Sequence, residues 1–180
     1  ANFGELRYDH FHSGIDIKTQ GTTGKEIVAA AAGYVYRISI SPGGFGKAVY
    51  LRHPSGYSTV YAHLDRFIPE IEEYVISKQY EQKSYMVTLW PPKDRFRFGQ
   101  GDVIAYSGNT GSSSGPHLHY EIRKSDDERP VNPLLFNFGV EDRIAPVIEE
   151  LVIFRAGRNT VIENSNSNIR FKVSGNSGRY

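Results

Sequence analysis

Short segments in which side chains alternate between two faces, separated by turns, fill the first two-thirds of this 180-residue chain. Residues 34–40 have a period close to two, and Pro42–Gly43–Gly44 then marks a turn. Residues 47–53 and 57–63 flank Pro54–Ser55–Gly56, which predicts a β-hairpin. Further strands are predicted at 85–90, 103–106 and 118–123. We therefore expect a mainly β protein.

One segment departs from this pattern. Pro69 is followed by three glutamates within four residues, as the first turn of a helix prefers. Ile71, Tyr74, Val75 and Lys78 then recur at spacings of three and four, which predicts one short helix over 69–82. Because strands precede and follow it, residues 69–98 are interpreted as an insertion on the β domain.

The character of the chain changes again near residue 136. Three further strands are predicted at 147–154, 160–163 and 168–174. Three strands are too few for an independent sandwich. We expect a first domain over 1–136 and, over 137–180, a partial β region that is part of a second domain.

Composition excludes several classes of protein and of metal site. Twenty-one basic and 20 acidic residues give a net charge of +1, with no basic stripe, so nucleic acid is not an expected partner. No apolar stretch approaches the roughly 18–20 residues that span a bilayer. Cysteine is absent, which rules out disulfides and thiolate ligands. Any metal must be bound by His, Asp or Glu.

Two histidines near the end of the β region stand two positions apart. On a strand, His117, His119 and Glu121 would project from one face, while Leu118 and Tyr120 would face a core. Two neighbouring imidazoles could then reach one small volume, where one binds a metal and the other acts on its bound water. A His-x-His pair alone is weak evidence, because it also occurs on ordinary strands.

A second cluster lies near the N-terminus. His12 and Asp16 flank the flexible Gly14, and an even spacing in extended chain would direct both side chains to one side. Imidazole and carboxylate are suitable zinc ligands, and three of them with one water make a catalytic site. His63 ends a predicted strand, where its ring can lean into a groove. Each feature alone is more simply structural; their conjunction favours a metal site.

Three linked motifs resemble the lysostaphin-type (LytM-like) zinc metallopeptidases. They are His12–Ser13–Gly14–Ile15–Asp16, Tyr61–Ala62–His63–Leu64, and Gly108–Asn109–Thr110–Gly111 running into Gly115–Pro116–His117–Leu118–His119–Tyr120–Glu121. The resemblance covers about residues 3–136. It implies a small antiparallel β-sheet domain with an open groove and one zinc ion. It also implies that His12, Asp16 and His119 bind the metal and that His63 and His117 are catalytic.

The resemblance further implies a metalloendopeptidase that cuts peptide stems or crosslinks of bacterial peptidoglycan. The bond could lie in a glycine bridge or in a crosslink with D-amino acids. We expect a cell-envelope, periplasmic or secreted location, with a signal sequence removed. The alternatives are a non-catalytic family member that regulates other cell-wall hydrolases, or a module that only binds the wall.

Four other residues near these motifs have open roles. Glu121 could orient a ligand ring or face solvent. His10 is interpreted as a groove-edge or surface residue, and His53, beside the hairpin turn, as structural. Tyr8 lies near the first ligand without a firm assignment.

Overall fold

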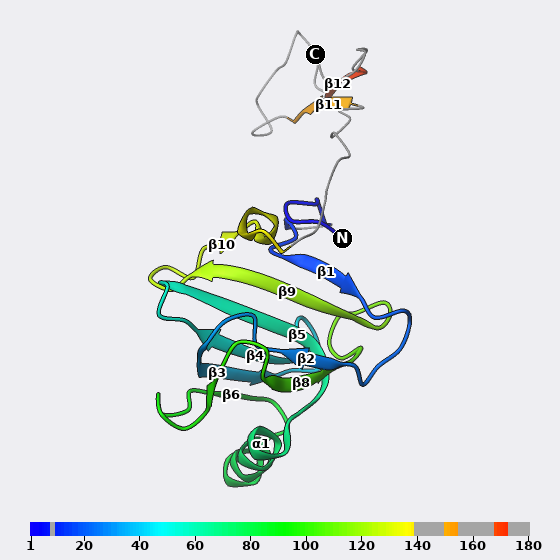
Figure 1. Cartoon of the computed structure of the whole chain (residues 1–180). Coiled ribbons are helices and arrows are strands. Elements are labelled where there is room, and N and C mark those ends of the chain that lie inside the picture. Colours follow the sequence, from blue (N-terminus) through cyan, green and yellow to red (C-terminus); the bar gives the residue numbers. More distant parts are fainter. Residues whose placement is uncertain (8–9, 139–149, 155–167, 173–180) are drawn as a thin grey trace. The chain divides into compact units, whose positions relative to one another are not determined.

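The computed structural model describes residues 1–7, 10–138, 150–154 and 168–172 (Figure 1). The chain divides into two compact units, Ala1–Asn137 and Phe138–Tyr180. Among the described residues, no helix combines the length and apolar character that crossing a membrane requires.

The first unit is built on one ten-stranded antiparallel sheet (Figure 1). Its main path has the order β1-β9-β5-β4-β3-β6. These strands are β1 (Ile15–Lys18), β9 (His117–Lys124), β5 (Tyr57–Phe67), β4 (Lys47–Arg52), β3 (Gly33–Ile40) and β6 (Val87–Leu89). Beside this path, β8 (Val103–Ser107) pairs with β5 and with β2 (Glu26–Val28). β7 (Arg97–Phe98) pairs with β3, and β10 (Pro130–Val131) pairs with β9. The prediction of a mainly β, antiparallel fold is confirmed.

Several strands differ in length from their predictions, and for β5 and β6 the pairing explains the difference. β5 continues past His63 to Phe67, because its last residues change partner at a bulge and pair with β8. β6 begins only at Val87, although residues 85–90 were predicted as a strand. Its partner β3 ends at Ile40, which pairs with Val87, so residues 85 and 86 have no neighbouring strand to join.

The predicted helix forms as α1 (Pro69–Gln82). Proline begins it, Glu70 and Glu72 occupy the first turn, and Lys83 ends it in a left-handed conformation. Ile71 and Val75 are fully buried in the main core, so one face of the helix packs on the domain. A 3-10 helix, η1 (Pro133–Phe136), follows β10, and the Asn132 side chain accepts a hydrogen bond from the Leu134 amide at its start.

The two faces of the sheet have different surroundings. The large hydrophobic core takes alternate residues of the central strands, among them Val49, Leu51 and Tyr61. A smaller cluster forms from Ala48, Tyr50, Val60 and Ala62, with Tyr36 and Phe45 packed against it. Because neighbours on a strand point to opposite faces, these two clusters lie on opposite sides of the sheet. The small cluster shares its side with the candidate site.

The described part of the second unit is one antiparallel pair, β11 (Glu150–Ile153) and β12 (Ile169–Lys172). Arg170 Nη1 forms an ion pair with Glu150 Oε2 at 2.7 Å across this pair. Both strands fall inside segments predicted as strands. The strand predicted at 160–163 lies outside the described residues.

Candidate metal centre

Strand pairing brings the two histidine clusters together. In the register of β1 against β9, Asp16 lies opposite His119. His12 precedes β1, and the chain bends at Gly14 rather than continuing extended as the spacing predicted. A Cβ atom on Gly14 would lie 2.2 Å from the Tyr120 carbonyl oxygen, so only glycine fits this close approach. The bend returns the His12 ring over β9.

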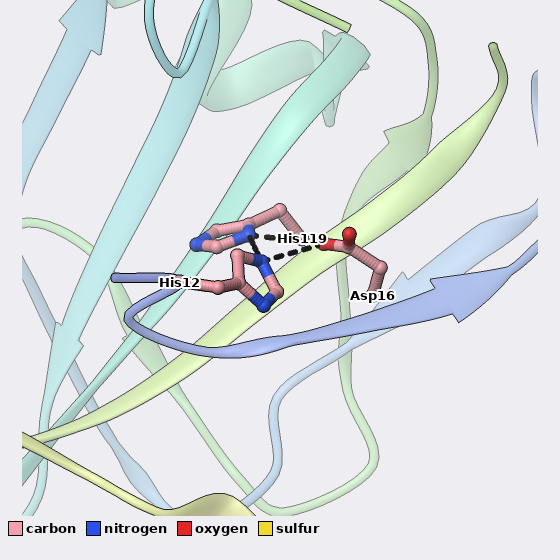
Figure 2. Close-up of side chains that lie close together, drawn as sticks. All are labelled: His12, Asp16 and His119. Carbon is pink, nitrogen blue, oxygen red and sulfur yellow. Dashed lines mark hydrogen bonds and ion pairs between the residues drawn. The ribbon is translucent and has the colours of Figure 1, made fainter. Parts of the chain in front are cut away.

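The side chains of His12, Asp16 and His119 converge on one point (Figure 2). His12 Nε2 lies 2.9 Å from His119 Nδ1 and 3.0 Å from Asp16 Oδ1. His119 Nδ1 lies 3.1 Å from the same carboxylate oxygen. Both rings are buried, at 6% and 4% exposure, while Asp16 is partly exposed at the opening. Three ligand atoms of the type that zinc prefers therefore surround one position.

Hydrogen bonds on the far side of each ring show which nitrogens face that position unprotonated. His12 Nδ1 lies 2.9 Å from the Asn2 carbonyl oxygen, which can only accept, so Nδ1 carries the hydrogen. His119 Nε2 lies 2.8 Å from Glu121 Oε1 and likewise donates. In the neutral rings His12 Nε2 and His119 Nδ1 then present lone pairs to Asp16 Oδ1 and to each other. Three acceptors at this distance repel unless a proton or a metal cation lies between them, so the donor set fits zinc.

The electrostatics of Asp16 and His119 agree with such a site. Burial alone would raise the pKa of Asp16, but a hydrogen bond from His119 and the neighbouring His12, His117 and His119, when these rings carry a second proton, hold the pKa well below its usual range. Burial would lower the pKa of His119, yet its bonds to Asp16 and Glu121 raise the pKa above the ordinary value. The carboxylate is therefore ionised at neutral pH, and the site attracts positive charge.

Glu121 is fully buried behind His119, so its interpretation as a solvent-facing residue is wrong. Its Oε1 accepts hydrogen bonds from His119 Nε2 and from the Ser13 hydroxyl. Its Oε2 accepts from Arg123 Nε at 2.6 Å. Burial would raise the pKa of Glu121, but His119, Arg123 and Ser13 together lower it. An ionised carboxylate thus contacts the His119 ring and favours its Nε2–H form.

His117 and His63 stand beside the three converging residues. His117 Nδ1 donates to the Gly115 carbonyl at 2.8 Å, and its Nε2 lies 3.4 Å from Asp16 Oδ1. His63 Nδ1 donates to the Thr110 carbonyl at 2.8 Å. The centroids of the two rings are 4.8 Å apart. Both backbone bonds assign the hydrogen to Nδ1, so each neutral ring keeps Nε2 as an acceptor.

A backbone irregularity places the His63 ring. His63 has a φ of 58°, a left-handed conformation that is unusual for a residue with a side chain, just before the bulge of β5. Strain of this kind is found most often at functional sites. Burial lowers the pKa of His63, so the ring is neutral at neutral pH.

A cavity of about 500 Å³ contains all five of these predicted site residues. Its walls come from the N-terminal segment, from the loop after β3 and from the loop after β8. The two loops are tightly packed: a Cβ atom on Gly46 would lie 2.4 Å from Thr110. The cavity is lined by Arg7, His10, His12, Ser13, Asp16, Gly44, Phe45, His63, Ser112, Ser113, Ser114, His117 and His119.

Sequence reasoning missed two residues in this cavity. Phe45 stacks on His119, with ring centroids 5.1 Å apart, and Arg7 Nη2 lies 3.4 Å from Asp16 Oδ2. Neither residue belongs to a motif with a recognisable spacing.

The other two histidines lie where they were predicted. His10 is exposed at the edge of the cavity, and His53 is buried against Ala32 and Thr59. Tyr8 lies outside the described residues.

The fold and the site together define a class of protein: an antiparallel β-sheet domain with a groove that gathers a His–Asp–His group, which could hold a metal ion, and two more histidines. The model of the family "Peptidase family M23" matches residues 10–80 and 93–133. The chain therefore belongs to peptidase family M23, and the predicted family resemblance is confirmed. The unmatched residues between these two stretches include the end of α1 and β6.

Similar proteins include both peptidases and an activator. The chain is 36% identical to the DD-carboxypeptidase/endopeptidase Mpg of Neisseria meningitidis over 68% of its own length and 22% of that protein. It is 31% identical to the murein hydrolase activator NlpD of Escherichia coli, over 69% of the chain and 26% of that protein. The chain thus spans about a quarter or less of these relatives. The catalytic domain of the M23 protein EnpA from Enterococcus faecalis superimposes with a TM-score of 0.54 and 25% identity, covering 76% of this chain and 88% of that domain.

Proposed function

We propose that the chain is a zinc-dependent endopeptidase that hydrolyses peptide bonds in the stems or crosslinks of peptidoglycan. The observation that carries this proposal is the convergence of His12 Nε2, Asp16 Oδ1 and His119 Nδ1, three unprotonated acceptors within 3.1 Å of one another. These atoms would hold one zinc ion per chain. We assign the peptidase domain to residues 1–136 and propose that 137–180 belong to a second domain.

The remaining two histidines would supply the proton transfers. Bound zinc would polarise the scissile carbonyl and make the attacking water more acidic. His117 Nε2, free to accept because Nδ1 is held by Gly115, would take the proton of that water and pass it to the leaving amine. His63 would stabilise the oxyanion. Its Nδ1–H is held by Thr110, so the donor would be Nε2, in the ring that has first taken up a proton from solvent.

The substrate class is supported by the relatives. Mpg is named as a DD-carboxypeptidase/endopeptidase, a peptidase name, and NlpD as an activator of murein hydrolases, a name that concerns the cell wall. A substrate of this kind would place the chain in the cell envelope, in the periplasm or outside the cell. Peptidoglycan peptides are therefore the proposed partner.

A second candidate function is that of a non-catalytic regulator of other wall hydrolases. The similarity to the activator NlpD supports it. Against it stands the cavity, which holds three candidate ligands together with His63 and His117, as hydrolysis would require. A zinc titration separates the two candidates, because a regulator without a metal site would bind no zinc.

The proposed activity is tested by digestion of purified peptidoglycan with the zinc-loaded protein. We expect new amino and carboxyl ends, identified by mass spectrometry, that disappear when a chelator is present and return when zinc is added. The variant His117→Ala serves as the control for a contaminating hydrolase. Intact peptidoglycan after incubation with protein that has bound zinc would refute the proposed activity.

A further inference from the structure

A row of alternating charges leads away from His119 along β9 and into the turn that follows it. Glu121 Oε2 accepts from Arg123 Nε at 2.6 Å, and Arg123 Nη1 lies 3.5 Å from Glu128 Oε2. Side chains on a strand alternate between its two faces, so residues 119, 121 and 123 project from the same face of β9. Glu128 lies in the turn between β9 and β10, with a φ of 57°.

The outer end of this row is anchored by two other strands. The Tyr36 hydroxyl of β3 donates to Glu128 Oε2 at 2.9 Å. Arg52 Nη2, at the end of β4, lies 3.4 Å from Glu128 Oε1. Arg123 is itself mostly covered, with 15% of its side chain exposed, and its guanidinium lies 5.9 Å from the centre of the Tyr50 ring. A charged residue in such a position has lost much of its hydration and depends on its partners.

The geometry of Glu121 gives Arg123 a function beyond packing. A buried carboxylate bound on one oxygen only could rotate and present either oxygen, or neither, to His119. Arg123 binds the second oxygen, so the first stays on His119 Nε2. That contact fixes the ring with its hydrogen on Nε2 and its lone pair on Nδ1, the atom that faces Asp16 and His12.

We propose that Arg123 is a positioning residue for the metal centre, which it serves through Glu121, and that Glu128 holds Arg123 in place. The proposal rests on the proposed metal site, but not on catalysis. It extends the site across the sheet, from the cavity to the turn between β9 and β10.

The chain offers a matched control for the test. Arg37 also stacks on Tyr50, with its guanidinium 4.6 Å from the ring centre, and it also lies partly buried on this side of the sheet. Arg37 lies on β3, which is separated from β9 by β4 and β5, and no hydrogen bond or ion pair to Glu121 is found for it among the described residues. Arg123→Met and Arg37→Met therefore remove similar side chains from the same aromatic ring, while only the first removes a bond to Glu121.

The experiment measures two properties of both variants, of Arg123→Lys and of the unaltered protein. The first is the tautomer of His119 in metal-free protein at alkaline pH, read by nitrogen-15 NMR. The second is zinc affinity, measured by competition with a chromophoric chelator. For Arg123→Met we expect His119 to lose its uniform Nε2–H form and zinc affinity to fall roughly 10–100-fold. Arg37→Met should change neither, and Arg123→Lys should recover part of the affinity.

Thermal unfolding of each variant separates positioning from general stability. Equal losses of zinc affinity in Arg37→Met and Arg123→Met would overturn the proposal, as would an unchanged tautomer in Arg123→Met. Because the tautomer is read without metal or substrate, its outcome is independent of whether the protein cleaves peptidoglycan. A protein that binds zinc, shows these shifts and cuts nothing would refute the proposed activity and leave the role of Arg123 supported.

Discussion

His12 Nε2 lies 2.9 Å from His119 Nδ1, although 107 positions separate the two residues in the sequence. The pairing of β1 with β9 produces this approach, and the bend at Gly14 completes it. Both rings turn an unprotonated nitrogen toward the Asp16 carboxylate. This arrangement of two ring nitrogens and a carboxylate oxygen is unfavourable without a cation between them.

Removal of any one of the three proposed ligands should abolish zinc binding. The variants His12→Ala, Asp16→Ala and His119→Ala each leave two ligands, too few for a stable site. We expect bound zinc and peptidase activity to be lost together. The measurement is metal content after dialysis, by mass spectrometry, beside the rate of peptide hydrolysis. Full zinc occupancy in any of the three would show that the ligand set is wrong.

Removal of His117 or His63 should have a different effect. His117→Ala and His63→Ala should keep most of the zinc and lose about 10²–10⁴-fold in rate, the usual size of a general acid–base contribution. The same two measurements apply. If His117→Ala lost its metal, His117 would be a ligand and not a base.

Gly14→Ala should damage the site without removing a functional side chain. The added methyl group would meet the Tyr120 carbonyl oxygen at 2.2 Å, so the segment that carries His12 and Asp16 must move away from β9. We expect weaker zinc binding and a lower unfolding temperature. Gly43→Ala is the control, because its Cβ would meet only Ser112 Oγ at an ordinary 3.6 Å. Similar zinc affinity in the two variants would argue against the close packing of β1 on β9.

The stability of the metal-free protein should fall in mild acid, in part through His53. Burial lowers the pKa of His53 below its ordinary value of 6.5. The unfolded chain then binds the proton first as the pH falls, so the contribution of His53 is fully present above about pH 6.5 and is lost below it. His63 acts in the same direction, and His119, whose pKa is raised, acts in the opposite one.

Urea unfolding between pH 5 and 7.5 checks the contribution of His53. The free energy of unfolding of His53→Gln should depend less steeply on pH than that of the unaltered protein. The two slopes should differ by at most about 1.4 kcal/mol per pH unit, the value for one proton. Identical slopes would show that His53 does not titrate differently in the folded state. The variant keeps a polar group near the Ala32 carbonyl, so the difference reports ionisation.

The local patterns of the sequence predicted much of this fold. The alternation in residues 34–40 and the turn at Pro54–Ser55–Gly56 correspond to β3 and to the β4–β5 hairpin. The proline and glutamates at 69–73 mark the start of α1. Strand ends were less accurate, because they depend on partners: β5 continues where β8 is available, and β6 begins only opposite the end of β3.

The site was predictable as a set of residues, while its supporting contacts were not. The two-residue spacing of His117, His119 and Glu121 follows from the period of a strand. Whether Glu121 is buried depends on Arg123 and Ser13, and the second of these reaches it from 108 positions away. The stacking of Phe45 on His119 likewise requires the loop after β3 to pack against β9 in three dimensions, for which the sequence carries no local signal.

The central claim is that His12, Asp16 and His119 hold one zinc ion. Anomalous diffraction at the zinc edge, from crystals grown with added zinc, tests it most directly. We expect a single strong peak within bonding distance of His12 Nε2, Asp16 Oδ1 and His119 Nδ1, with a further coordination position open toward the cavity. A peak bound by other residues, or no peak at this site in excess zinc, would contradict the account.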